Sequence, residues 1–258
     1  MKKINQRVIF NKTQHFIYSI NFMLFIFSSN AFSTPSNSDN STLFVNPEVS
    51  IEAYISDNSK IDSLKDQLSA KWNFNINVQK QGQHKIVNNC ESTLAAYIHG
   101  FRPVRQSEFG AYQYSYIQCQ SIDLITQMTS PTKSYIQRIN LDKHTLNLVP
   151  ASVGEVISND DQRKINKYPA MTLGEFTHIT KVTQKDNYSV EIEDDSDGIQ
   201  YMTILAKGDF NGDHIEDLLL SVNNQVKEGS YNTYNLYILT KTHKNGVWEI
   251  VTKFPEPH

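Results

Sequence analysis

The residues with the clearest chemical spacing lie in one short stretch near the end of the chain, from Gly208 to Leu219. Oxygen-bearing side chains stand there at alternate positions, and a further carboxylate follows: Asp209, Asn211, Asp213 and Asp217. Such oxygens are the ligands of hard cations, and calcium takes about six to eight of them. With the backbone carbonyl of Ile215 and water completing the shell, the stretch can enclose one ion. The spacing therefore predicts a structural calcium site.

This stretch differs from an EF-hand loop. An EF-hand carries Gly at its sixth position and a bidentate Glu at its last, where this chain has His214 and Leu220. The apolar run from Leu218 to Leu220 follows at once, which favours a loop that enters a β-strand rather than a second helix. We therefore exclude the EF-hand.

The stretch resembles the calcium loop of FG-GAP and VCBS-type repeats. Their pattern is Asp-x-Asn-x-Asp-Gly-x-x-Asp-Leu, and their loop lies between two antiparallel strands. The resemblance covers about a dozen residues in a single copy, so it implies a type of loop and not a propeller. His214 replaces the family's Gly, which suits a left-handed backbone better. We expect calcium binding to persist with lower affinity; the alternative is an acidic, solvated surface turn.

The start of the chain has the order of features typical of a secretory signal peptide. Basic residues precede an apolar stretch from Phe16 to Phe27, and small residues follow it. We predict a signal peptide over residues 1–33, cleaved after Ala31 or Ser33, and a bacterial periplasmic or secreted protein. The alternative is an uncleaved anchor, but a spanning helix needs roughly 20 apolar residues. No stable membrane insertion is expected after cleavage.

The chain has two cysteines, Cys90 and Cys119. Exported proteins meet an oxidising environment, in which a pair of thiols forms a disulfide. The long spacing is unlike the Cys-x-x-Cys arrangement of redox and metal sites. We therefore predict a structural disulfide between these two residues.

The hydrophobic pattern predicts an α+β fold whose first part is mainly helical. Residues 34–57 form a flexible lead-in, rich in Ser, Asn and Pro from Thr34 to about Thr42, and a first extended segment. Residues 58–150 show helical spacing, with the disulfide joining a helix after Cys90 to one over Tyr116–Met128. Ser130-Pro131 predicts a further short helix that extends through Ile136.

The remainder predicts an antiparallel sheet. Residues 151–175 form a connector, whose polar run 158–164 predicts either a helix cap or an exposed loop. Over residues 176–258 apolar and polar residues alternate, and hairpin signals such as Asn245-Gly246 separate the runs. We expect a meander of five or six strands with the calcium loop between two of them.

The net charge of the chain and the motifs that it lacks argue against several classes of function. The net charge of -3 and the lack of a basic stripe argue against a nucleic-acid partner. The sequence contains no Gly-x-Ser-x-Gly, His-Glu-x-x-His or phosphate-binding motif. We expect an exported, non-enzymatic domain that binds another protein, such as an immunity or inhibitor protein against a toxin acting in the cell envelope. The alternatives are a calcium-dependent envelope hydrolase, which would show a pocket of converging Asp, Glu or His, and a structural envelope factor.

Overall fold

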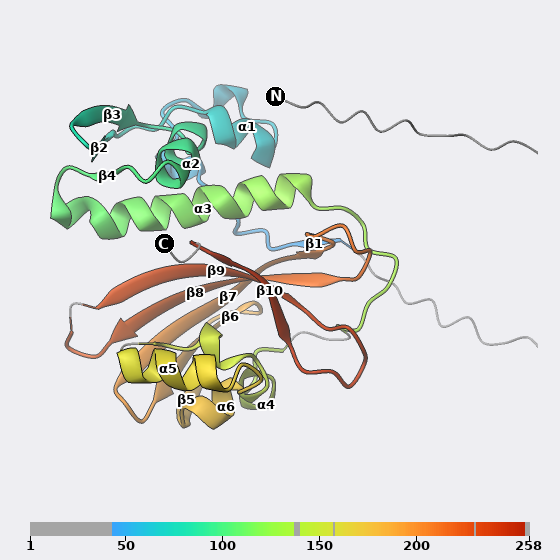
Figure 1. Cartoon of the computed structure of the whole chain (residues 1–258). Helices are drawn as coiled ribbons and strands as arrows, with labels where there is room; N and C mark the ends of the chain where they lie inside the picture. Colours follow the sequence, from blue (N-terminus) through green and yellow to red (C-terminus); the bar gives the residue numbers. More distant parts are fainter. Residues whose placement is uncertain (1–42, 137–139, 157, 230, 256–258) are drawn as a thin grey trace, which may run out of the picture. The chain divides into compact units, whose positions relative to one another are not determined.

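The computed structural model describes residues 43–136, 140–156, 158–229 and 231–255. The predicted signal peptide and its cleavage site lie outside these residues, as does the lead-in up to residue 42. The described part is α+β with antiparallel sheets, as predicted, but residues 58–150 are not mainly helical throughout, because they also contain a small sheet (Figure 1). Within it, no helix combines the length and the apolar character needed to cross a membrane.

A seven-stranded antiparallel sheet is the centre of the fold. Its order is β10-β9-β8-β7-β6-β5, and β1 pairs with the end of β7. The strands are β1 (Phe44–Val45), β5 (Ile179–Gln184), β6 (Ser189–Asp194), β7 (Gly198–Gly208), β8 (Asp217–Val226), β9 (Asn232–Thr240) and β10 (Glu249–Phe254). From β5 to β10 each strand pairs with the next in the chain, so the predicted meander is confirmed.

Both faces of this sheet are buried, because successive residues of a strand point to opposite sides. In β8, Leu219 packs in the core on one face, while Leu218 and Leu220 pack in the core on the other. A bulge in β7 between Ile204 and Ala206 turns these two residues toward different cores. The run Leu218–Leu220 of β8 is therefore apolar at consecutive positions, unlike a strand with one solvated face.

One face is covered by helices and a small sheet (Figure 1). These elements are η1 (Glu52–Tyr54), η2 (Asn58–Lys60), α1 (Leu64–Ser69), β2 (Ile76–Lys80), β3 (Gln83–Val87), α2 (Cys90–Ile98), β4 (Arg102–Pro103), η3 (Gln106–Glu108) and α3 (Phe109–Gln127). The long helix α3 lies against the sheet, and the Gln113 side-chain amide donates a hydrogen bond to the Tyr234 carbonyl of β9 at 3.2 Å. The order of the small sheet is β3-β2-β4.

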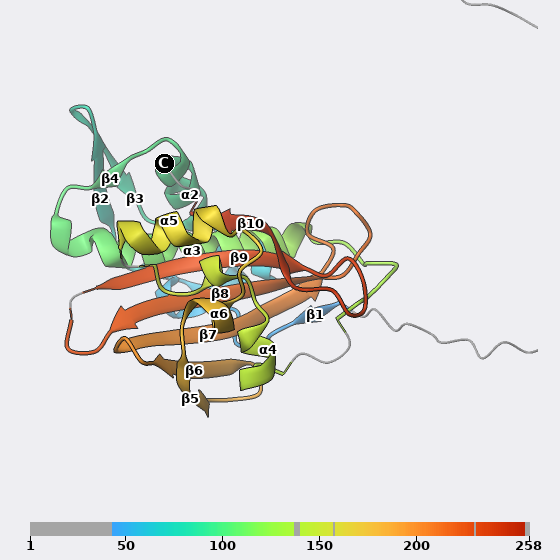
Figure 2. The same cartoon turned by 60° about the horizontal axis from the view of Figure 1, so that its bottom comes forward.

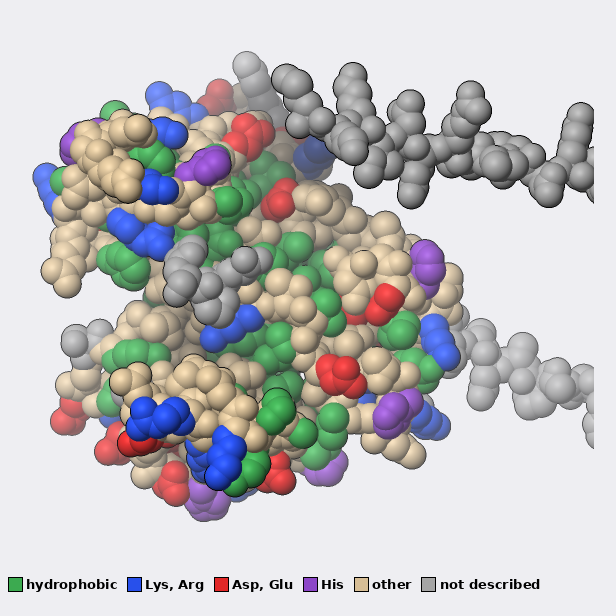
Figure 3. All heavy atoms as spheres, viewed as in Figure 1, with side chains coloured by type: hydrophobic (Ala, Val, Ile, Leu, Met, Phe, Trp, Pro, Cys, Tyr) green, Lys and Arg blue, Asp and Glu red, His purple; other side chains and the backbone are tan. Residues whose placement is uncertain are grey.

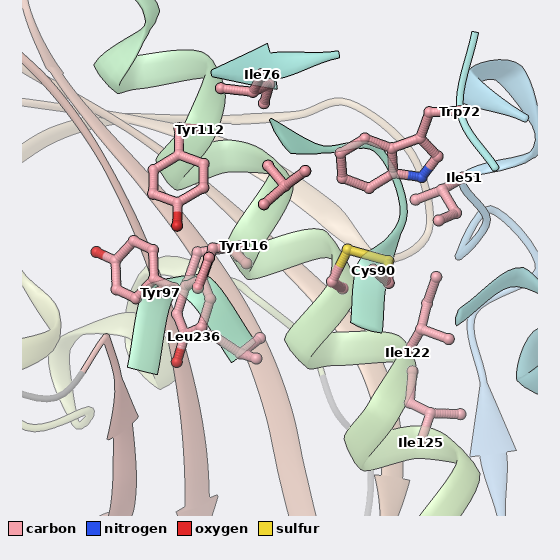
Figure 4. Close-up of a cluster of buried hydrophobic side chains, with 14 of the residues drawn as sticks. Ile51, Trp72, Ile76, Cys90, Tyr97, Tyr112, Tyr116, Ile122, Ile125 and Leu236 are labelled. Carbon is pink, nitrogen blue, oxygen red and sulfur yellow. A yellow bond between two sulfur atoms is a disulfide. The ribbon is translucent and has the colours of Figure 1, made fainter. Parts of the chain in front are cut away.

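The disulfide joins α2 to α3. Cys90 and Cys119 are bonded, as predicted, and both are fully buried in the core between α3 and the large sheet; Figure 4 shows Cys90 among the side chains of this core. Helix α2 begins at Cys90 because Asn89 caps it: its side chain accepts the Ser92 N–H at 2.8 Å, while the Ser92 hydroxyl accepts the Asn89 N–H. The bond therefore fixes the first turn of α2 to the middle of α3.

The opposite face is covered by four short helical segments (Figure 2). They are α4 (Lys143–Asn147), η4 (Ala151–Val153), α5 (Asn159–Lys167) and α6 (Leu173–Phe176). The polar run 158–164 is a capped helix: the Ser158 hydroxyl accepts the Asp161 N–H, and the Asp161 carboxylate accepts the Ser158 N–H. The predicted connector 151–175 thus contributes to the helical layer that covers the core on this face of the sheet.

The helix predicted from Ser130 to Ile136 is wrong. Thr129 exchanges backbone hydrogen bonds of 3.0 and 2.9 Å with Asp209, and Thr132 donates to the His214 carbonyl at 2.9 Å. This extended segment, residues 129–133, is called the strap below. Pairing with the loop after β7 satisfies backbone groups that a helix would otherwise satisfy internally, and this outweighs the local Ser-Pro signal.

Candidate functional site

The predicted calcium ligands lie on the connection between two central strands. Residues 209–216 join β7 to β8, and Gly208 and Asp217 at the facing ends of those strands pair with each other. The structure therefore brings all five predicted ligand residues into one hairpin connection. They are Asp209, Asn211, Asp213, Ile215 and Asp217.

Asp209 organises the backbone of this loop. Its carboxylate is buried and accepts the N–H groups of Asn211 at 3.2 Å, Gly212 at 2.6 Å and His214 at 2.9 Å. Burial acts to raise the pKa of Asp209, but these N–H groups and the His214 side chain together lower it. The carboxylate therefore stays ionised and holds the loop closed.

Asn211 and Asp213, on the exposed rim of the loop, each accept the backbone N–H group two residues later in the chain. Asn211 Oδ1 accepts the Asp213 N–H at 2.9 Å, and Asp213 Oδ1 accepts the Ile215 N–H at 2.7 Å. The backbone is left-handed at Gly212, with φ of 81°, and at His214, with φ of 66°. His214 thus adopts the left-handed backbone conformation at the position where the loops of FG-GAP and VCBS-type repeats carry Gly.

Asp217 supplies the most buried carboxylate of the loop. Its Oδ2 accepts the Phe210 N–H at 3.1 Å, but its Oδ1 and the Thr240 hydroxyl have no hydrogen-bond partner of standard geometry. Burial raises the pKa of Asp217 to about 6, with Asp213 and Asp209 adding to the effect and the nearby Thr240 hydroxyl and the Phe210 N–H opposing it. A cation would compensate this buried, partly unsatisfied acid.

The donor chemistry of the loop fits calcium, while its side chains do not converge on one point. Among the described residues, no group of three or more His, Cys, Asp or Glu side chains is arranged to hold a metal ion. The reason is local, because the Asp209 and Asp213 oxygens are directed at backbone N–H groups. Asp209, Asn211, Asp213 and Asp217 are the side chains that would hold the ion.

The strap connects this loop to the end of α3. Its Lys133 carbonyl accepts the Glu216 N–H at 2.8 Å, and the buried Glu216 carboxylate contacts the Ser134 hydroxyl and Lys207 Nζ at 2.5 and 3.3 Å. Sequence reasoning missed Glu216 and Thr129 as supports of the loop. No local pattern marks them, since their partners lie far away in the chain.

No protein-family model, curated protein or solved structure matches this chain. What the loop binds therefore has to follow from its own residues and from its position between β7 and β8.

A second site lies in the layer on the opposite face of the sheet. It is a pocket of about 440 Å³ beside α5, α6 and the turn after β6. Five carboxylate side chains and one histidine are among its lining residues: Glu155, Asp161, Glu175, Asp194, Asp195 and His178. The sequence does not show that these residues meet, because they come from three separate stretches of the chain.

Glu155 is the unsatisfied member of this pocket. Its side chain is 6 % exposed, and neither carboxylate oxygen has a hydrogen-bond partner. By contrast, Asp194 Oδ1 accepts the N–H groups of Ser196 at 2.9 Å and Gly198 at 3.0 Å. Burial raises the pKa of Glu155 to about 7, and the negative charge of Asp194 adds to the shift.

Glu155→Gln is expected to stabilise the protein above pH 7. Folded Glu155 holds its proton up to about pH 7, whereas the unfolded side chain loses it near its ordinary pKa of 4.5. The folded state therefore binds more protons in this window, and the wild-type protein loses stability as the pH rises through it. At pH 8 the variant should be more stable by about 1 kcal/mol or more, the usual cost of an unsatisfied buried polar group.

Urea unfolding at pH 5 and pH 8 measures this difference, which should shrink at the lower pH. Glu175→Gln is the matched control in the same pocket. The Thr172 N–H lowers the pKa of exposed Glu175, so this control should lose stability at pH 8 instead of gaining it. If the stability of the wild-type protein and that of Glu155→Gln changed in the same way with pH, the raised pKa could not belong to Glu155.

Proposed function

We propose that the chain is an exported protein-binding domain without catalytic activity, braced by calcium at the loop 209–217. In this proposal it acts in the periplasm as an immunity or inhibitor protein against a toxin that attacks the cell envelope. The observation that carries the proposal is an apolar row on the open face of the small sheet.

This apolar row consists of Ile86 and Val104, on either side of Asn77 in β2. Asn77 pairs with Ile86, and the Val104 N–H donates to the Asn77 carbonyl at 2.9 Å. Ile86 is 60 % exposed and Val104 is 44 % exposed, whereas Val78, the next residue of β2, is fully buried. Apolar side chains aligned in register on an outer face are suited to bury against another protein.

The compartment and the class of partner have independent support. The buried Cys90–Cys119 bond is of the kind that persists in oxidising compartments. The face drawn in Figure 3 carries basic and acidic side chains interspersed, which suits a protein partner better than a nucleic acid. Both observations agree with an exported protein-binding domain.

The test is capture of a partner by the mature protein from the envelope fraction of its own cells, in calcium. The wild-type protein should retain one stoichiometric partner, and an Ile86→Asp/Val104→Asp variant should lose it at least tenfold. Because both side chains are exposed, the variant should unfold at the wild-type temperature. Retention of the same partner by the variant would refute the role of the apolar row.

A calcium-dependent envelope hydrolase is the second candidate, because the acidic pocket has the composition that such a site needs. Glu155 with its raised pKa would be its general acid. Hydrolysis of an envelope polymer by the wild-type protein, and its loss in Glu155→Gln, would favour this candidate. Capture of no partner and absence of hydrolysis would leave the structural envelope factor.

Calcium is expected to raise the thermal midpoint of the mature protein. A ligand at a hundredfold excess over its Kd stabilises by about 2.7 kcal/mol, which corresponds to roughly 5–11 °C for a chain of this size. Magnesium should give a much smaller shift, because it demands a stricter octahedral shell. Thermal unfolding in calcium, in magnesium and in chelator measures both effects.

Asp213→Ala is the control for this experiment, because Asp213 lies on the exposed rim of the loop. It should abolish the calcium shift while leaving the midpoint in chelator almost unchanged. Identical wild-type midpoints in all three solutions, with no bound ion, would disprove the calcium site.

A further inference from the structure

The acidic pocket contains a buried carboxyl group without a counter-charge. Glu155 is the only buried residue among its five carboxylates, and both of its oxygens lack a donor. In the described part of the chain neither Glu155 nor Asp194 forms an ion pair, while Lys181 of β5 and Lys227 after β8 both bind Glu193. A buried carboxylate of this kind requires either a proton or a cation.

The other carboxylates of the pocket already have partners. Asp161 and Glu175 close the capping boxes of α5 and α6. The carboxylate of Asp195 lies 3.9 Å from Nδ1 of exposed His178. Glu155 is the one carboxylate of the pocket that is buried with neither oxygen hydrogen-bonded, and Asp194 Oδ2 lies beside it.

Gly198 allows these two carboxylates to come together. A Cβ atom at position 198 would lie 2.4 Å from Glu155 Oε2 and 2.7 Å from Asp194 Oδ2, so any larger residue would collide with both. The two oxygens flank one point above the glycine, and their separation cannot exceed the sum of these distances. Position 198 of β7 therefore carries no side chain where the Glu155 and Asp194 carboxylates approach each other.

The number of ligands and the volume argue against a metal ion. Calcium needs about six to eight oxygens, whereas two carboxylates meet above Gly198. The pocket volume of about 440 Å³ lies in the range of sites for organic ligands. A carboxylate with two unpaired oxygens matches the parallel N–H groups of a guanidinium.

We propose that this pocket binds a guanidinium group, held between the carboxylates of Glu155 and Asp194 that meet above Gly198. The group comes either from a free small molecule or from an arginine side chain of a partner protein. This inference does not depend on the calcium loop or on the apolar row, which involve other elements.

Calorimetric titration at pH 8 with Nα-acetyl-L-arginine methylamide tests the proposal. The citrulline counterpart has almost the same shape without the charge, and it should bind at least tenfold more weakly. Glu155→Gln should weaken the arginine probe at least tenfold. Glu191→Gln is the control, because its carboxylate lies on β6 but pairs with Lys185 outside the pocket, and it should bind as the wild-type protein does.

Two further probes define the ligand. Agmatine represents a free small molecule, so tighter binding of agmatine than of the peptide-like probe supports that source, and the reverse order supports a partner's arginine. Equal binding of the corresponding lysine derivative would overturn the assignment to guanidinium. Equal binding of the arginine and citrulline probes, unchanged binding by Glu155→Gln, or no binding at millimolar concentration would overturn the site itself.

Discussion

Asp209→Ala is expected to lower the free energy of unfolding by about 3–5 kcal/mol even without calcium, because hydrogen bonds to a charged group contribute about 1.5–3 kcal/mol each and do not add fully. The substitution leaves three loop N–H groups, of Asn211, Gly212 and His214, without their acceptor. It should lower the thermal midpoint by roughly 6–20 °C. Thermal and urea unfolding in chelator measure the effect.

The comparison with Asp213→Ala separates the fold of the loop from metal binding. Asp213 is exposed and accepts one loop N–H group besides the Asn211 amide, so its loss should cost far less in chelator. Asp209→Asn keeps one acceptor oxygen and should fall between the two alanine variants. Equal stability of Asp209→Ala and Asp213→Ala in chelator would show that Asp209 does not organise the loop.

The Cys90→Ala/Cys119→Ala variant is expected to lose about 3–4 kcal/mol, because the bond closes a loop and restricts the unfolded chain. The two residues are 29 positions apart. Alanine avoids the buried hydroxyl that serine would introduce where both cysteines are fully enclosed. Urea unfolding of the oxidised wild-type protein and of the variant measures the difference.

Two controls accompany this prediction. Wild-type protein that is unfolded and refolded with a reductant should match the double variant in stability. The calcium shift of the thermal midpoint should persist in the variant, because the bond lies in α2 and α3 and not in the loop. A double variant as stable as the oxidised wild-type protein would contradict the prediction.

The sheet was predictable because its signals are local. Hairpin turns and period-two alternation occur within neighbouring residues, so the meander from β5 to β10 followed from the sequence. The disulfide was predictable for a different reason, since only one pairing of two cysteines exists. Both predictions required no knowledge of the tertiary structure.

The failures have long-range causes. The strap was predicted as a helix because Ser130-Pro131 is a good helix start, while its partners are His214 and Asp209. Strand β3 was missed because most of its residues are exposed and polar at the edge of a small sheet. Glu155 carries no local signal either, since its role arises from Asp194 and from the space above Gly198.

Hydrogen bonds between distant parts of the chain bear on the order in which it folds. The Asn46 side-chain amide donates to the Ile204 carbonyl, 158 positions later in the chain. The Gln113 side-chain amide of α3 donates to the Tyr234 carbonyl, 121 positions later. Whether the chain emerges from a ribosome or through a translocation channel, its disulfide-bonded helices emerge well before the strands that cover them. The apolar face of these helices stays exposed until β9 has been made and packs against it. A chain truncated before β9 would therefore aggregate and not fold.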